Sequence, residues 1–153
     1  MGSYAFTAVG TNTELIGLPF DVPLAEWPDE LIVYVPRGIS RHLVRFVQVG
    51  GEVFAVKEAT DRFVLREHTL LRSLAEHSVP VVEAYGTVVE RRDDAGDDLG
   101  GLLITRHLPF SQPYRSLFTG RSLPGLRTRL LDALVGLFVR LHQAGFYWGH
   151  CSL

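Results

Sequence analysis

Hydrophobic and polar residues alternate with the period of β-strands between residues 31 and 57. Residues 31–35 form an apolar run rich in β-branched side chains, which ends at the turn signal Pro36-Arg37-Gly38. Residues 43–49 alternate, and Gly50-Gly51 is a two-residue turn that tolerates positive φ before residues 52–57 return. The pattern therefore predicts three consecutive antiparallel strands.

The period changes to that of a helix after residue 60. Apolar residues recur at helical spacing between Asp61 and His77, which predicts an amphipathic helix with Asp61 as its N-cap. Glu67 fills the missing position of the apolar stripe, so we expect its carboxylate to point inward. The other members of that stripe are Phe63, Leu70, Leu71 and Leu74.

The remaining segments complete a mixed fold. Residues 81–89 and 101–106 are predicted strands, and the charged run 91–98 between them is expected to be a solvated hairpin tip. A connector containing three prolines, 107–125, precedes a long amphipathic helix over 127–144. The apolar face of that helix consists of Leu130, Leu134, Leu137, Phe138 and Leu141. The order predicts an α+β fold, a five-stranded antiparallel sheet with one inserted helix, followed by a long helix.

Composition and charge exclude several classes of protein. The chain has 153 residues, of which 46% are hydrophobic and 21% charged, so it can bury a sizeable core. A net charge of −2 lacks the positive excess of a non-specific nucleic-acid binder. The lone Cys151 allows no internal disulfide, and the six scattered histidines predict no metal site. With no apolar run of membrane-spanning length and no signal peptide, we expect a cytoplasmic protein.

Lys57 is the only lysine among the 15 cationic residues. It ends an apolar strand, so its ammonium needs a counter-ion or an anionic ligand. Glu67 is the expected counter-ion, in a pair that would suit a lysine presenting a fixed charge to phosphate oxygens. In the alternative interpretation, Lys57 reaches the edge of the sheet and Glu67 lies at the rim of the helix stripe.

These residues carry a family resemblance. The segment Val53-Phe54-Ala55-Val56-Lys57 resembles the Val-Ala-Ile-Lys strand of protein kinases. Longer stretches resemble a bacterial family catalogued as domain of unknown function 4032, which is similar to lipopolysaccharide-kinase-like and protein-kinase-like proteins. Those stretches are 36–42, 66–72, 104–115 and 140–149, and the resemblance extends from about Pro19 to Leu153.

The resemblance implies an ATP site in a kinase-like amino-terminal lobe. Lys57 would pair with the α- and β-phosphates, with Glu67 as its partner on the inserted helix. Gly38 would lie in the loop that covers the phosphates, which here has one glycine where protein kinases have three. The hinge whose backbone meets the adenine would be Thr105, Arg106, His107 and Leu108.

The lack of periodicity in the first thirty residues and the resemblance together predict three parts of the chain. A loosely packed leader, 1–30, precedes the lobe, 31–108, and the lobe precedes the start of an incomplete carboxy-terminal lobe, 109–153. In that last part a linker and the long helix lead to a truncated catalytic loop.

The catalytic loop departs from the family pattern. His150 occupies the position of the expected catalytic aspartate, and the asparagine and aspartate that would hold Mg²⁺ fall beyond Leu153. We therefore expect a partial or degenerate kinase-like domain that binds at most a nucleotide, without Mg²⁺ and without phosphotransfer.

Two alternatives from other classes remain open. One is a non-catalytic protein-interaction module, which binds a partner or self-associates through an unpaired apolar face of the 127–144 helix. The other is a truncated product of a full-length kinase-like gene. The phosphoacceptor is not predicted, because the residues that choose it would lie in the carboxy-terminal lobe.

Overall fold

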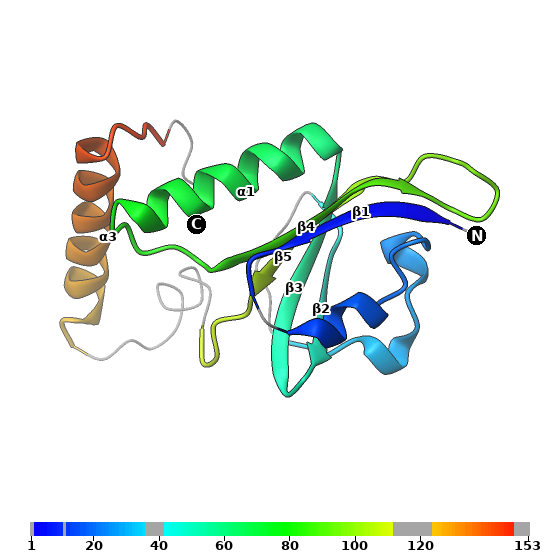
Figure 1. Ribbon diagram of the computed structural model, residues 1–153. Helices are drawn as coiled ribbons and strands as arrows, with labels where there is room; N and C mark the ends of the chain where they lie inside the picture. The colour runs from blue at the N-terminus through cyan, green and yellow to red at the C-terminus, as the bar shows by residue number, and fades with distance from the viewer. Residues whose placement is uncertain (1, 11, 36–41, 112–123, 149–153) are drawn as a thin grey trace.

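A computed structural model describes residues 2–10, 12–35, 42–111 and 124–148 (Figure 1). The strands are β1 (Ser3–Ala8), β2 (Val44–Val49), β3 (Glu52–Ala59), β4 (Ala84–Arg92) and β5 (Gly101–Arg106). The helices are α1 (Asp61–Glu76) and α3 (Leu126–Gln143), and the 3₁₀ turns are η1 (Thr13–Gly17), η2 (Leu24–Glu26) and η3 (Asp29–Leu31).

The five strands form one sheet in the order β1-β4-β5-β3-β2, with every neighbouring pair antiparallel. Helix α1 is inserted between β3 and β4, and the long helix α3 comes last. This arrangement confirms the predicted α+β fold. The β2–β3 hairpin turns at Gly50 and Gly51, whose φ values of 59° and 80° need the freedom of glycine.

The strand predicted over residues 31–35 is wrong. That segment meets β2 through an isolated bridge between Ile32 and Val47 and a 2.8 Å hydrogen bond from the Val33 N–H to the Phe46 carbonyl. The fifth strand is instead β1, which pairs with β4 at the far end of the sheet. The 31–35 segment is apolar because Leu31 and Ile32 pack against the core.

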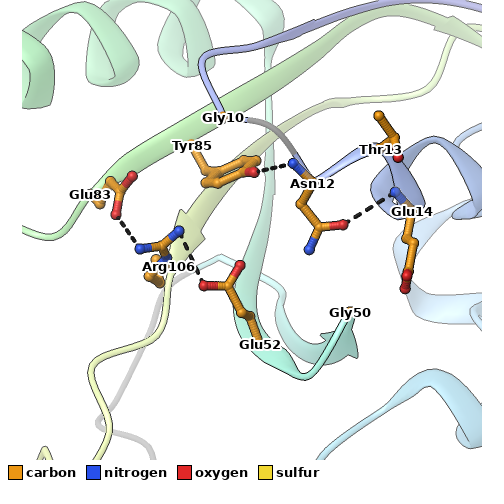
Figure 2. A pocket seen from close by; sticks show the side chains of 9 residues that line it. All are labelled: Gly10, Asn12, Thr13, Glu14, Gly50, Glu52, Glu83, Tyr85 and Arg106. Carbon is orange, nitrogen blue, oxygen red and sulfur yellow. Dashed lines mark hydrogen bonds and ion pairs between the residues drawn. The ribbon is translucent and has the colours of Figure 1, made fainter.

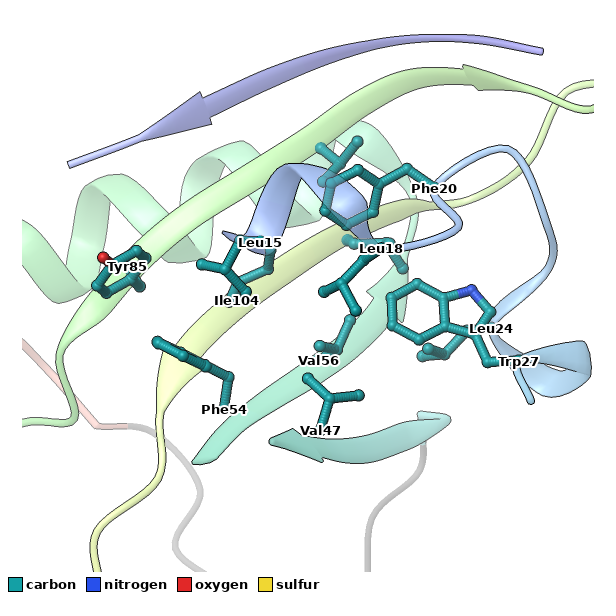
Figure 3. Close-up of a cluster of buried hydrophobic side chains, with 12 residues drawn as sticks. Leu15, Leu18, Phe20, Leu24, Trp27, Val47, Phe54, Val56, Tyr85 and Ile104 are labelled. Atoms are coloured by element: carbon teal, nitrogen blue, oxygen red, sulfur yellow. The ribbon is translucent and has the colours of Figure 1, made fainter. Parts of the chain in front are cut away.

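The prediction of a loosely packed leader is also wrong. After β1, the turns η1 to η3 cover one face of the sheet and supply much of its core (Figure 3). Pro23 and Pro28 precede η2 and η3 with φ of −52° and −54°, so ring-constrained residues set where each turn begins. The buried side chains of this segment are Leu15, Leu18, Phe20, Leu24 and Trp27. They follow no regular period, which is why the hydrophobic pattern did not reveal them.

Successive residues of each strand face opposite layers. Phe54 and Val56 of β3 join the core beneath the 3₁₀ turns. The intervening Ala55 and Lys57 lie on the other face, where α1 packs against β3, β4 and β5. The sheet is therefore a middle layer, with the 3₁₀ turns on one side and α1 on the other (Figure 1).

The buried face of α1 differs from the predicted one. Thr60 is the N-cap, and the Asp61 carboxylate instead accepts the Glu90 N–H at 2.9 Å. Phe63 and Leu70, which were predicted to point inward, are exposed. The buried residues of α1 are Val64, His68 and Leu74, so contact with β4 and β5 has selected a neighbouring stripe that includes a histidine.

Helix α3 packs the carboxyl-terminal part of its predicted apolar face against the rest of the chain. Leu141 packs with Leu74 and Val79, and Leu137 and Phe138 lie against this cluster. Leu130 and Leu134 of the same face are partly exposed and are not part of this cluster, so an interaction through this face stays a prediction. The exposed apolar residues of α3 lie on another face, where Leu131, Val135 and Val139 are 52%, 60% and 48% exposed. In the part of the chain that the structure describes, no helix is long and apolar enough to cross a membrane.

Arg91 corrects the prediction that the whole charged run 91–98 is solvated. Its side chain is buried, with an exposed fraction of 1% for the residue. A positive φ of 55° at Glu90 and a register shift between Ser3 and Ala5 mark the irregularity that precedes it in β4. Strand β4 thus continues to Arg92, and only the residues beyond it form the hairpin tip.

Candidate functional site

The candidate site is built around Lys57, near the carboxyl end of β3. Its Nζ lies 2.6 Å from Oε2 of Glu67 on α1. The pair is partly open to solvent, since the two side chains are 27% and 38% exposed. The structure thus brings together the two residues that the sequence singled out, and the ammonium keeps donors beyond the one used by Glu67.

The sheet around Lys57 forms a mostly apolar wall. In the strand register, Lys57 lies between Val44 of β2 and Leu103 of β5. One step along the same face, Ala55 lies between Phe46 and Thr105. Ala55, with only a methyl side chain, is the smallest residue of this row. The Cα atoms of Ala55 and Lys57 are two residues apart along β3, roughly 7 Å.

The predicted hinge begins at the end of β5. The Arg106 N–H donates to the Glu83 carbonyl at 3.0 Å, and the His107 N–H donates to the Val53 carbonyl at 2.9 Å. Both N–H groups are therefore engaged within the protein. The His107 ring lies edge-on to Phe46, with a centroid distance of 5.2 Å and an interplanar angle of 77°. Thr105 and His107 thus lie on the same face of the sheet as Ala55, and Leu108 follows as an exposed side chain.

The Arg106 side chain points to the opposite face of the sheet. Its guanidinium pairs with Glu52 at 3.2 Å and with Glu83 at 3.0 Å (Figure 2). It also lies over the ring of Tyr85, whose hydroxyl oxygen accepts the Asn12 N–H at 2.7 Å. These residues line a hollow of about 480 Å³. Arg106 can therefore contribute its backbone, but not its charge, to the Lys57 face.

His68 is the residue after Glu67 on α1, and it faces the sheet. Burial lowers the pKa of His68 below its ordinary value of 6.5, and the nearby Arg72 guanidinium lowers it further. Its Nε2 is buried and has no hydrogen-bond partner among the described residues. The imidazole is thus neutral at pH 7 and acts as a packing group behind the Lys57–Glu67 pair.

Two predicted site residues, Gly38 and His150, lie outside the described residues. Within the described ranges, no three His, Cys, Asp or Glu side chains gather in a way that could hold a metal ion. Arg45 of β2 lies on the core face and donates to the Ala25 carbonyl at 3.4 Å.

Comparison with solved structures supports the fold of this chain. The chain is similar to the crystal structure of an aminoglycoside-3'-phosphotransferase of type VIII, with a TM-score of 0.50 and 27% sequence identity. The match covers 80% of this chain and 41% of that chain. The lobe is kinase-like. This chain thus spans less than half the length of the protein it resembles.

The remaining comparisons found no relative. No family model matches the chain, and no curated protein matches it. The structural comparison thus shows a similarity to kinase-like proteins. The resemblance to domain of unknown function 4032 is not confirmed, because no family model matches.

Sequence reasoning missed several residues that shape the site. Phe46 was recognised only as a strand residue, and its ring contact with His107 depends on pairing through β3. The engagement of the Arg106 side chain by Glu52 and Glu83 had no local signal, because the three residues come from three separate strands or loops.

Proposed function

We propose that this kinase-like lobe binds ATP on the face of the sheet that carries Lys57. In this proposal the ammonium meets phosphate oxygens, and Glu67 holds the ammonium in position. The observation that carries it is the ion pair between Lys57, the only lysine of the chain, and Glu67 of the inserted helix α1, with 2.6 Å between Nζ and Oε2.

The stability of the fold does not explain this pair. Exposed ion pairs contribute about 0–1 kcal/mol, because the Coulomb energy is screened and two long side chains are ordered. With both partners about a third exposed, Lys57 and Glu67 belong to this class. A fixed ammonium beside an open wall is better explained by an anionic ligand, and a phosphate chain is the anion that the kinase-like fold supports.

In this proposal the base would lie over Ala55. The neighbouring Phe46 ring offers apolar and aromatic contact, and Thr105 lies beside Ala55 on β5. Because the N–H groups of Arg106 and His107 are already engaged, any hydrogen bond from this stretch to the base uses other groups. We therefore expect the base to be held more by apolar contact than by hydrogen bonds to the hinge.

The proposal is for binding and includes no phosphoryl transfer step. Within the part of the chain that the structure describes, no three carboxylate, imidazole or thiol groups gather in a way that could hold an ion such as Mg²⁺. Gly38 as a loop residue over the phosphates and His150 at the catalytic position stay predictions from the sequence.

Thermal unfolding with ATP tests the proposal. At about 100 times Kd, a ligand adds about 2.7 kcal/mol of stability, which for a domain of this size is a rise of roughly 5–10 °C in Tm. We expect this rise with ATP but not with adenosine, and we expect Lys57→Met to lose most of it. Arg62→Met removes one exposed positive charge from the start of α1 and is the matched control. An equal ATP shift in Lys57→Met and the parent would show that Lys57 does not bind phosphate.

A protein-interaction module is the second candidate function. It is supported by the exposed α3 residues Leu131, Val135 and Val139, which recur at i, i+4 and i+8 on one helix face. If this face self-associates, Val135→Glu will lower the sedimentation coefficient at high protein concentration. A sedimentation coefficient that Val135→Glu leaves unchanged would remove self-association through α3 from consideration.

A further inference from the structure

Strand β1 lies at one end of the sheet and pairs on one side only. Its partner is β4, and no described strand pairs with its other edge (Figure 1). In the register Ala5 faces Val89 and Thr7 faces Thr87, and the series continues to a 2.9 Å hydrogen bond from the Val9 N–H to the Tyr85 carbonyl. Because hydrogen-bonded pairs alternate in an antiparallel ladder, residues 5, 7 and 9 direct their backbone groups toward β4. Tyr4, Phe6 and Ala8 therefore present their N–H and C=O groups at the open edge.

This edge lacks the features that usually prevent strand pairing. Edge strands are commonly protected by charged side chains, proline or a very short length. Strand β1 has the sequence Ser-Tyr-Ala-Phe-Thr-Ala, six residues without charge or proline. The irregularity near its start falls on β4 at Glu90, so β1 itself can accept a further strand.

We propose that β1 pairs with β1 of a second copy of this chain, in antiparallel orientation about a two-fold axis at Phe6. In this register Phe6 lies opposite its counterpart, Tyr4 lies opposite Ala8, and all three direct their backbone groups across the interface. Such a contact is isologous and closes at two copies. It joins the two sheets edge to edge by strand addition.

The side chains of β1 suit self-pairing in this register. On one face Tyr4 would meet the small Ala8, and the two Phe6 rings would meet at the axis. The rings of Tyr4 and Phe6 both pack on the ring of Phe20, each with a centroid distance of 5.3 Å, so both are held in position before the strands pair. On the other face the exposed Ala5 would lie opposite Thr7, and no pair sets like charges against each other.

The dimer leaves the candidate nucleotide site accessible. Strand β1 is at one end of the sheet and β2 is at the other, with Lys57 on β3 beside β2. Pairing through β1 is therefore independent of the proposed function, and the two proposals can fail separately.

Sedimentation velocity over a range of protein concentrations tests the dimer, with paired charge variants of Ala5 and Thr7. The double variant Ala5→Lys/Thr7→Lys places like charges opposite each other twice across the axis, and should raise the dimer dissociation constant about tenfold or more. The matched variant Ala5→Lys/Thr7→Glu places opposite charges at the same positions and should keep the dimer. A parent protein that is monomeric at every concentration, or that forms open-ended polymers, would contradict the proposal, as would equal weakening by both variants.

Amide hydrogen exchange supplies a second readout at single residues. In a monomer the Phe6 and Ala8 amides face solvent and exchange fast, whereas the Ala5 and Thr7 amides are protected by β4. In the dimer, Phe6 and Ala8 should gain protection as the protein concentration rises, and Val135→Glu on α3 should not change this. Fast exchange of Phe6 at concentrations where dimers sediment would place the interface elsewhere.

Discussion

Arg91 on β4 and Glu58 on β3 form an ion pair at 2.9 Å, beneath the amino-terminal segment of the chain. The guanidinium also donates to three backbone carbonyls, at 2.7 Å to Phe20, at 2.6 Å to Val22 and, through the Nη1 that binds Glu58, to Gly100. Glu58 is the neighbour of Lys57 in sequence but faces the opposite layer. This pair therefore ties the amino-terminal segment to the strand that carries the candidate site.

Removing the Arg91 guanidinium should strongly destabilise the fold. Arg91→Met leaves the carboxylate of Glu58 without its partner and three buried carbonyls unbonded, a loss of about 3–5 kcal/mol in the free energy of unfolding. Urea denaturation measures it. The control is Arg92→Met, which removes a pair with Asp98 that is 53% and 80% exposed and should cost less than about 1 kcal/mol. Similar losses in the two variants would contradict the role of Arg91.

Neighbouring residues of η1 test whether the amino-terminal segment belongs to the core. Leu15 is fully buried, whereas Ile16 is 56% exposed. Leu15→Ala should lower the free energy of unfolding by about 2–5 kcal/mol, because it leaves a cavity against the sheet. Ile16→Ala, measured in the same urea series, should lower it by less than about 1 kcal/mol. A small effect of Leu15→Ala would mean that this segment does not pack as described.

The Lys57–Glu67 pair should affect binding more than folding. Glu67→Gln keeps the size of the side chain and removes its charge, so the free energy of unfolding should change by less than about 1 kcal/mol. The affinity for ATP, measured by calorimetry, should fall about tenfold, because the ammonium is no longer held toward the wall. Glu76→Gln, at the far end of α1, is the control and should bind ATP as the parent does. An ATP affinity unchanged by Glu67→Gln would argue that Lys57 is positioned by other groups.

His68 should make the stability depend on pH on the acid side of neutrality. Its pKa is lowered in the folded protein, first by burial and then by Arg72, while the unfolded chain keeps the ordinary value of 6.5. Below pH 6.5 the unfolded state therefore binds more protons, so the stabilisation that is present above this pH is lost as the pH falls.

The difference between two histidine variants measures this contribution. Urea midpoints between pH 5 and pH 8 should show a flatter decline for His68→Leu than for the parent. His77→Gln, on the exposed end of the same helix, should keep the parent's profile. A decline that His68→Leu leaves unchanged would assign the pH dependence to other groups.

The sequence was most informative where structure is local. The β2–β3 hairpin follows from Gly50-Gly51, and the packing of Leu137, Phe138 and Leu141 of α3 follows from the helical period. The Lys57–Glu67 contact was predictable because a strand and the helix directly after it place both residues within one short segment. Turn chemistry and periodicity act over a few residues, and these features depend only on residues that are close in the sequence.

Features that depend on distant partners were not predictable. Pairing of β1 with β4 joins residues 78 to 89 positions apart, and no local pattern in β1 indicates it. Arg91 is buried because carbonyls of the amino-terminal segment reach it, although its sequence neighbours are charged. His68 is buried because α1 packs on β4 and β5 in an orientation that the positions of its leucines did not determine.

The amino-terminal segment has a practical consequence for anyone who cuts this chain into fragments. A fragment that started at Leu31, as the hydrophobic pattern alone would suggest, would lose a strand of the sheet and five apolar side chains of its core. It would also expose the guanidinium of Arg91 and the back of β3, directly behind Lys57. If nucleotide binding were measured on such a fragment, the result would reflect the lost packing behind β3 rather than the properties of the candidate site. Binding studies therefore need the chain from its first strand onward.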